Sequence, residues 1–283
     1  MKRITMNMLL PICCDVPAYR ALSDELGSLE TPGGLVRAAV AIARHQMNKV
    51  DLGDVEGMLA RYATTVAQRV RGSQPQAILA HLHQLLFEEE NFTGNSQDYY
   101  SPMNSCLPHV LASHTGLPIT LCLVYKAVAD RLGLNVRGLG MPGHFLADVE
   151  VDGKSMWVDP FAGGRIVTLD EARQRVSSQF GKDLVWSDEF LKPVNNRYWL
   201  TRILQNLISA FGRAGHYSDV AAVLEMEMLL WPGEARLQRD LALVLARIGM
   251  GESASMWLDL YLQNNPADPN RGELKQLLTT LAT

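Results

Sequence analysis

One segment in the middle of the chain carries the alternation of apolar and polar residues that is typical of a β-hairpin. Residues 145–151 alternate, Asp152-Gly153 follows, and residues 154–158 return in the same pattern. An Asp-Gly pair between two alternating runs is the strongest short-range signal for a hairpin with a two-residue turn. The chain is therefore expected to contain an antiparallel pair of strands here, with residues 136–141 available as a further short strand.

Almost everywhere else the spacing of apolar residues predicts helices. Apolar residues recur at intervals of three and four along 35–47, 55–70, 77–89, 103–114 and 118–132. A single hairpin cannot bury a core alone, so helices must cover it. The sequence thus predicts an α+β fold that is mostly helical, with a small antiparallel sheet.

Local signals mark where several elements begin. Thr168 stands three residues before Glu171, which is the spacing of a capping box at the start of a helix over 168–178. Pro75 suits the first turn of another helix, because proline there gives up an N–H that has no partner in any case. The polar stretch 91–102 contains Gly and Pro and is expected to be a loop.

The last third of the chain repeats itself. Gly215 and Gly249 are separated by 34 residues, and so are Pro232 and Pro266. This is the period of the tetratricopeptide repeat, in which two antiparallel helices meet at a tight turn. We expect α-helical tetratricopeptide-type repeats over 193–283, with turns at the two glycines. Two repeats are too few to stand alone, so they should pack on the preceding region.

Composition and charge argue against a nucleic-acid-binding, membrane-spanning or secreted protein. The net charge is −4 and no run of Lys and Arg forms a basic stripe, so nucleic acid is not an expected partner. No stretch approaches the roughly 18 apolar residues of a membrane helix. The start of the chain does not fit a signal peptide, because its apolar run is short and contains Asn7 and Pro11.

The four cysteines point to neither a disulfide framework nor a zinc site. None of them forms a CxxC pair, and the chain is too long for four cysteines to constitute its scaffold. The expected compartment is therefore the cytoplasm, where thiols stay reduced. We expect no cofactor and no metal.

Two polar residues beside the hairpin form a candidate pair. A two-residue turn makes Asp159 face Leu146, so His144 becomes its diagonal neighbour on the same face. A carboxylate beside an imidazole fixes the tautomer of the ring, which is the orienting half of a nucleophile–His–Asp triad. The alternative is a structural histidine. The opposite face is apolar and should meet the core: Phe145, Ala147, Val149, Val151, Met156 and Val158.

Several strings make the chain resemble a known family. GLPIT at 116–120, PGHF at 142–145 and WVDPF at 157–161 stand in the order of the transglutaminase-like core, where a helix bearing Cys precedes strands bearing His and Asp. More narrowly, the chain resembles the bacterial SirB-type family, and the string at 99–105 also fits it. Members of that family join a transglutaminase-like N-terminal domain to tetratricopeptide repeats.

The resemblance implies a division of the chain. It covers residues 35–164 and extends through the repeats by architecture. It implies a helical N-terminal region with a transglutaminase-like (papain-like) core over 1–192, the core itself at about 91–165, and the repeats over 193–283.

The position of the nucleophile departs from the family pattern. His144 and Asp159 match the family's His and Asp, but counting back from Gly133, which ends the helix, places the catalytic Cys position at Pro118. Proline carries no nucleophile. Cys122 lies one turn further on the same helix face, beyond the first turn in which the helix dipole lowers a thiol pKa.

Other nucleophile candidates are weaker. Cys106 begins the preceding helix and could reach a cleft, although a small buried apolar role is the alternative for it and for Cys122. Thr120 is expected to be a cap or core residue. Cys13 and Cys14 lie in a tail with no partner in view.

Two functions remain open from the sequence. The first is a non-catalytic transglutaminase-like protein, a pseudoenzyme that binds a protein or peptide partner through its cleft and repeats as an adaptor or regulator, away from membranes. The alternative is a cysteine-dependent amide or peptide hydrolase or acyltransferase. In that case Cys122 or Cys106 would attack, His144 would act as the base and Asp159 would orient it.

Overall fold

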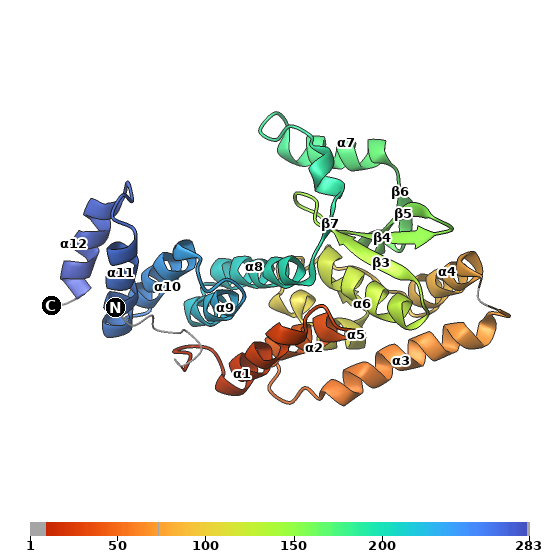
Figure 1. The fold of residues 1–283 in the computed structure, drawn as a ribbon, viewed down its shortest axis with the longest axis horizontal. Coiled ribbons are helices and arrows are strands. Elements are labelled where there is room, and N and C mark those ends of the chain that lie inside the picture. The colour runs from red at the N-terminus through yellow and green to blue at the C-terminus, as the bar shows by residue number, and fades with distance from the viewer. Residues whose placement is uncertain (1–9, 73, 282–283) are drawn as a thin grey trace.

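The computed structural model describes residues 10–72 and 74–281. Residues 1–9, on which most of the signal-peptide expectation rests, lie outside the described part. Helices surround one five-stranded antiparallel sheet, with strand order β6-β5-β4-β3-β7 (Figure 1). The strands are β3 (Asn135–Leu139), β4 (Leu146–Val151), β5 (Lys154–Asp159), β6 (Arg165–Val167) and β7 (Pro193–Val194), and β1 (Thr93–Gly94) pairs separately with β2 (Thr115–Gly116).

The helices fall into two groups along the chain. The first group precedes or borders the sheet: α1 (Val16–Glu25), α2 (Gly34–Ala43), α3 (Leu52–Arg69), α4 (Pro75–His83), α5 (Leu107–Ser113), α6 (Pro118–Arg131) and α7 (Leu169–Phe180). The second group follows it: α8 (Asn196–Ala214), α9 (Tyr217–Leu230), α10 (Ala235–Arg247), α11 (Gly251–Asn264) and α12 (Arg271–Leu281). Within the described residues, no helix is both long and apolar enough to cross a membrane.

The hairpin forms in the predicted register. Ala147 pairs with Val158, and Val151 pairs with Lys154. Asp152 and Gly153 both have positive φ, +50° and +73°, as a type I′ turn requires. The apolar face of the hairpin joins the main core, where α6 contacts β3 and β4. The opposite face packs a second, smaller cluster beneath α7, so the sheet lies between α6 and α7 (Figure 1).

Two predicted helices differ from the structure. The helix expected over 103–114 is broken into η4 (Pro102–Ser105), a 3₁₀ turn, and α5. Pro108 explains the break, because in a continuous helix its ring would clash with the carbonyl of Asn104. That carbonyl instead accepts the N–H of Leu117, at 3.2 Å. The helix expected over 77–89 begins at Pro75 and ends as a π-helical turn over 84–89.

Two start signals are confirmed. Thr168 and Glu171 form the predicted capping box at the start of α7. Pro75 occupies the first turn of α4. The loop predicted at 91–102 contains the two-residue strand β1, whose partner β2 directly precedes α6.

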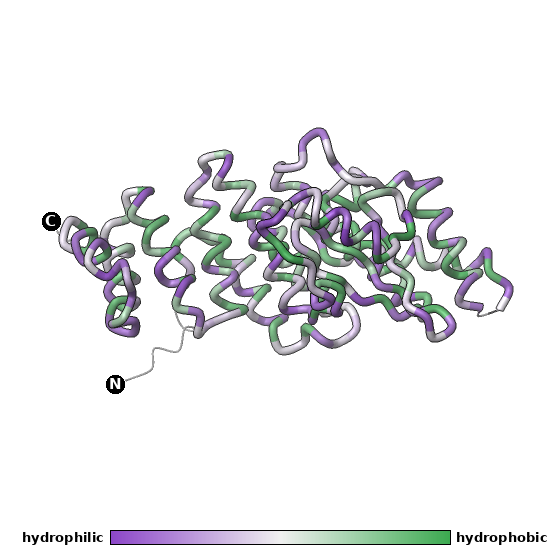
Figure 2. Tube along the Cα trace, turned by 90° about the horizontal axis from the view of Figure 1, so that it is seen from above, coloured by the Kyte–Doolittle hydropathy of each residue, from purple (hydrophilic) through white to green (hydrophobic). Residues whose placement is uncertain are grey.

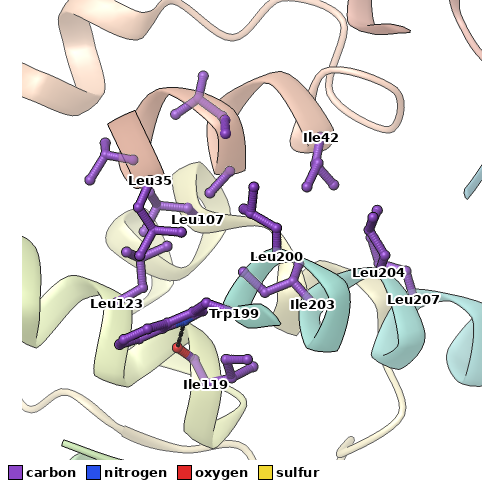
Figure 3. Packing of buried hydrophobic residues seen from close by; sticks show 14 of the residues in the cluster. Leu35, Ile42, Leu107, Ile119, Leu123, Trp199, Leu200, Ile203, Leu204 and Leu207 are labelled. Atoms are coloured by element: carbon purple, nitrogen blue, oxygen red, sulfur yellow. Dashed lines mark hydrogen bonds between the residues drawn. The ribbon is translucent and has the colours of Figure 1, made fainter. Parts of the chain in front are cut away.

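A single tryptophan joins the sheet region to the C-terminal helices. Trp199 of α8 is fully buried and donates its indole N–H to the carbonyl of Ile119 in α6, at 3.3 Å. Figure 3 shows its ring among Leu35 of α2 and Leu123 of α6. It also lies 4.6 Å from the Phe145 ring, centroid to centroid. Helix α8 therefore belongs to the core of the sheet region as well as to the C-terminal helices.

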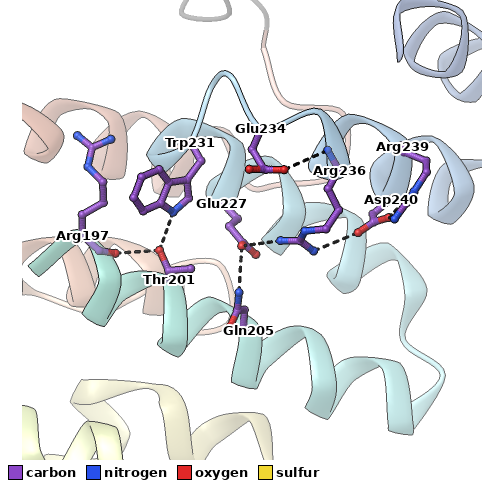
Figure 4. A network of polar contacts seen from close by, with 9 residues as sticks. All are labelled: Arg197, Thr201, Gln205, Glu227, Trp231, Glu234, Arg236, Arg239 and Asp240. Atoms are coloured by element: carbon purple, nitrogen blue, oxygen red, sulfur yellow. Dashed lines mark hydrogen bonds and ion pairs between the residues drawn. The ribbon is translucent and has the colours of Figure 1, made fainter. Parts of the chain in front are cut away.

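The C-terminal helices turn where the repeat predicts. Gly215 lies between α8 and α9 and has a left-handed φ of +75°, and Gly249 lies between α10 and α11 with a φ of +80°. Short connections join the helices from α8 to α11, and each helix packs against the next. Figure 2 shows them extending in a row from the sheet region. Polar contacts join three of them: buried Glu227 of α9 accepts from Gln205 of α8 and Arg236 of α10, both at 3.4 Å (Figure 4).

Substitution of two neighbouring glycines tests the turn at Gly215. Gly215→Ala should lower the free energy of unfolding by about 1 kcal/mol, because its left-handed φ disfavours a Cβ. Gly212→Ala is the matched control: Gly212 lies inside α8 with open space around a Cβ, so alanine should raise stability by up to about 1 kcal/mol. Urea denaturation of both variants measures the two signs, and equal signs would contradict the assignment.

Candidate functional site

His144 and Asp159 meet as the register predicts. His144 lies in the loop between β3 and β4, and Asp159 is the last residue of β5. The His144 Nε2 is 3.0 Å from Asp159 Oδ2. The predicted interaction between the two side chains is confirmed.

Asp159 collects more donors than the hairpin alone could supply. Its side chain is fully buried, and Oδ1 accepts the N–H of Phe161 and of Ala162, at 3.1 and 3.3 Å. These amides belong to η5 (Pro160–Ala162), the 3₁₀ turn that begins where Pro160 stops β5. Arg175 of α7 lies 3.0 Å from Oδ2. One carboxylate therefore joins β5, η5, the His144 loop and α7.

These contacts decide the charge of Asp159. Burial acts to raise the pKa of this carboxyl group, but the His144 hydrogen bond, the charges of His144 and Arg175 and the Ala162 amide outweigh it. The net result is a pKa below the ordinary value for aspartate. The carboxylate is thus ionised and fixed in place.

A series of contacts connects His144 to the start of α6. The imidazole ring stands edge-to-face on Phe161, with centroids 6.0 Å apart. Phe161 covers Gly94, where a Cβ would come within 2.4 Å of the ring. Gly94 pairs with Gly116, two residues before Pro118. Among the described residues, Nδ1 of His144 has no hydrogen-bond partner.

Helix α7 covers the pair on its other side. Arg175 binds Asp159, and the Gln179 side-chain amide lies against Gly143, which has a left-handed φ of +68°. His144 is consequently only 7% exposed. Sequence reasoning missed Arg175, because nothing in the spacing of α7 distinguishes it from the neighbouring exposed Arg173.

The structure does not bring a thiol to His144. Cys122 is fully buried, and its Sγ contacts the carbonyl of Phe145 at 3.6 Å. Cys106 is 1% exposed, and its Sγ lies 3.7 Å from the Pro102 carbonyl. Within the described residues, neither thiol makes a hydrogen bond to the imidazole. The expectation that Cys106 could reach a cleft is not met, since it is enclosed at the N-terminus of α5.

Burial also keeps both thiols protonated. It raises the pKa of Cys106 to about 12. Burial, reinforced by the negative charge of Asp159, raises the pKa of Cys122 well above the ordinary thiol value. A thiol acts as a nucleophile only as thiolate, so the raised pKa values act against both groups as nucleophiles. Pro118 stands at the first position of α6, as the sequence predicts.

The expectation for Cys13 and Cys14 is wrong. They do not lie in a tail without partners: the backbone amides of both donate to Glu225 of α9, at 3.1 and 2.8 Å, and the Cys14 side chain is buried. The contact uses the main chain rather than the thiols, so the residue types give no sign of it.

A large cleft lies away from this pair. It has a volume of about 950 Å³ and runs between α2, the C-terminal half of α6 and β3. Charged side chains of both signs, including Arg37, Lys126 and Glu56, border it, while His144 and Asp159 do not. In the part of the chain that the structure describes, no cluster of three or more His, Cys, Asp or Glu residues could hold a metal ion.

The fold and the site together define a class. Helix α6 packs on one face of an antiparallel sheet, and a His–Asp pair joins the loop before β4 to the end of β5. Pro118 is the first residue of that helix. This is the arrangement of helix, sheet and His–Asp pair that the family resemblance implied. The profile of the transglutaminase-like superfamily matches residues 53–205, more than half of the chain, and the chain belongs to this superfamily.

Similar proteins occur in bacteria and in mammals. A UPF0162 protein of Xylella fastidiosa is 30% identical over 251 residues, which cover 86% of this chain and 89% of that protein. A UPF0162 protein of Haemophilus influenzae is 25% identical, covering 71% of this chain and 74% of its own. F-box only protein 21 of Mus musculus is 26% identical over 65% of this chain but only 30% of its own length. No solved structure gives a significant match.

Removal of the Asp159 carboxylate tests its role. Asp159→Ala should lower the free energy of unfolding by about 3 kcal/mol, because it leaves His144, Arg175 and the η5 amides without their shared acceptor. Asp170→Ala is the control: this carboxylate is 95% exposed in the first turn of α7, and its removal should cost less than about 1 kcal/mol. Comparable losses in urea denaturation would argue against the network.

The lowered pKa of Asp159 sets a pH dependence. Because the folded-state pKa lies below the unfolded value of about 3.9, the ionised carboxylate stabilises the fold fully above about pH 5, and this stabilisation is lost as pH falls towards the folded-state pKa. The stability difference between the wild type and Asp159→Asn should therefore shrink below about pH 4. Denaturation measured at several pH values checks this, and a constant difference would refute it.

Proposed function

We propose that this protein is a non-catalytic member of its superfamily that binds a protein or peptide partner, as an adaptor or regulatory protein. The observation that carries the proposal is Pro118 at the first position of α6. That position is where the family resemblance implies the nucleophile, and proline supplies none. Fold alone does not imply activity, so the chemistry of the site decides.

The remaining thiols do not replace the missing one. Cys122 lies one helical turn beyond Pro118, roughly 5–6 Å along the axis. Its Sγ faces a carbonyl rather than the imidazole. A misplacement of about 1 Å can already cost a hundredfold in rate. The raised thiol pKa values add to this loss, because they leave almost no thiolate near neutral pH.

The His144–Asp159 pair has a structural use that does not need catalysis. It holds the loop before β4 to the end of β5, and Arg175 ties α7 to the same carboxylate. Loss of the nucleophile would leave these contacts intact. Retention of His144 and Asp159 in a chain with Pro118 is what a binding protein built on an enzyme fold would display.

The C-terminal helices supply the second part of the proposal. We assign α8–α11 to two tetratricopeptide-type repeats and the chain to the SirB-type group, with a boundary near residue 192 and α8 shared between the parts. In support, α9 and α11 begin and end 34 residues apart, and their flanking residues have similar dihedral angles: His216 and Met250 before them, Trp231 and Asn265 after them. Such helix pairs present surfaces to partners. We place the protein in the cytoplasm.

A second function rests on one observation. Nδ1 of His144 has no hydrogen-bond partner within the described residues, so the ring keeps a nitrogen available for a thiol. A cysteine-dependent hydrolase or acyltransferase would need Cys122 or Cys106 to move towards it. The enclosed positions of both thiols favour the binding protein instead.

Alkylation of the thiols decides between the two functions. Near neutral pH, iodoacetamide should modify Cys122 and Cys106 at least about a hundredfold more slowly in the folded chain than in urea, because both are enclosed and protonated. Mass spectrometry assigns each modified residue.

Two variants make the result specific. His144→Ala should leave the slow alkylation slow, and so should His216→Ala, a histidine that is 63% exposed and far from the site in the sequence. If Cys122 or Cys106 reacts faster in the folded chain than in the unfolded one, and only His144→Ala removes the excess, the protein is a thiol enzyme and the proposal fails.

A further inference from the structure

A second polar site lies where the beginning of the chain crosses the C-terminal helices. Glu225 of α9 is 6% exposed, and its carboxylate accepts three successive backbone amides: Ile12 at 2.6 Å, Cys13 at 3.1 Å and Cys14 at 2.8 Å. The next amide, that of Asp15, donates to Nδ1 of His45 at 3.2 Å. Two side chains thus bind four consecutive amides of a segment more than 200 residues distant from Glu225.

This arrangement recognises main chain rather than side chains. Successive N–H groups that converge on one anion form a strong, charge-assisted site. Burial raises the pKa of Glu225, and the hydrogen bonds from the three amides act against it. Without the segment, the buried carboxylate would lose all three amide donors at once. The contacts of Glu225 are made to backbone amides alone, so another peptide with three free amides in this order could supply them.

The chain's own segment does not fill the groove that it covers. A cavity of about 70 Å³ remains between Pro11 and the helices, lined by Met228 of α9, Leu241 of α10 and Trp257 of α11. The indole N–H of Trp257 is buried there without a hydrogen-bond partner among the described residues. A ligand with an apolar side chain could fill this cavity, and a carbonyl or hydroxyl oxygen beside that side chain could accept the Trp257 indole N–H.

The segment can leave without dismantling its neighbours. Helix α1 has its own cap, because Asp15 Oδ1 accepts the Ala18 amide at 2.9 Å, and it packs on α2. Leu10, at the edge of the groove, is 61% exposed, and Met256 beside it is 49% exposed. Methionine side chains adapt to different occupants.

We propose that the groove formed by α9, α10 and α11 is a peptide-binding site, occupied here by residues 10–14 as an internal ligand. The external ligand is a peptide of a partner protein, and this peptide resembles residues 10–14. It contains an apolar residue, a proline and a second apolar residue, followed by two residues with free backbone amides. This deepens the proposed function, on which it rests, by locating the partner site and giving the class of partner. The internal segment competes with the partner at an effective concentration on the order of millimolar.

The test uses the full chain with its internal ligand weakened. Ile12→Pro together with Cys14→Pro removes two of the three amides that Glu225 binds. The probe is a fluorescent peptide with the sequence of residues 10–17 and serine for both cysteines. Fluorescence anisotropy should show binding at least about tenfold tighter to this variant than to the wild type.

Two further variants test the clamp itself. Glu225→Gln, added to the proline variant, should abolish binding of the peptide, whereas Glu252→Gln, which alters an exposed carboxylate of α11 outside the groove, should not. Equal binding to all chains, or no effect of Glu225→Gln, would overturn the proposal. Exchange of segments between two copies, seen as a doubled mass in light scattering, would also overturn it.

Hydrogen exchange provides a readout in the wild-type chain if the proline variant does not fold. An excess of the unlabelled peptide should speed exchange at the amides of residues 12–14, because it displaces the internal segment; unchanged exchange would overturn the proposal. Alkylation of Cys106 and Cys122 reports separately on catalysis. A failure of the groove is therefore distinguishable from a failure of the non-catalytic assignment.

Discussion

The buried carboxylate of Asp159 is the interaction on which the sheet region depends. Four donors from three separate parts of the chain converge on it: the His144 ring, two amides of η5 and the guanidinium of Arg175. An ionised group without water is tolerated only when it is paired in this way. Its contacts consequently determine where the loop before β4, the turn after β5 and helix α7 must lie.

The same network is consistent with the proposed non-catalytic role, because none of its contacts involves a nucleophile. A catalytic triad needs the imidazole for two tasks, to hold a carboxylate and to activate a nucleophile. Here the contact between the imidazole and the carboxylate is present, and Pro118 is the first residue of α6, a position that suits proline. Membership of the transglutaminase-like superfamily thus describes the architecture, and function must be argued from the individual residues of the site.

The two halves of the molecule are coupled through shared elements rather than joined by a linker. Trp199 inserts α8 into the core of the sheet region, and Glu225 of α9 binds the segment that precedes α1. The first contact is apolar and buried, so it fixes how the C-terminal helices leave the core. The second is a small set of hydrogen bonds to backbone amides, for which the proposed partner peptide would compete.

The sequence by itself determined the local features of this protein, and the tertiary structure decided the rest. Alternation and turn chemistry set the hairpin register, which was enough to pair His144 with Asp159, and the 34-residue period located the turn at Gly215. Each of these follows from a pattern repeated over a few neighbouring residues. Arg175 and Glu225 have no such pattern, because their partners lie far away in sequence and are chosen by helix packing. The burial of Cys106 and Cys122 likewise depends on how the helices pack on one another and on the sheet. The spacing of residues along the sequence does not show this packing.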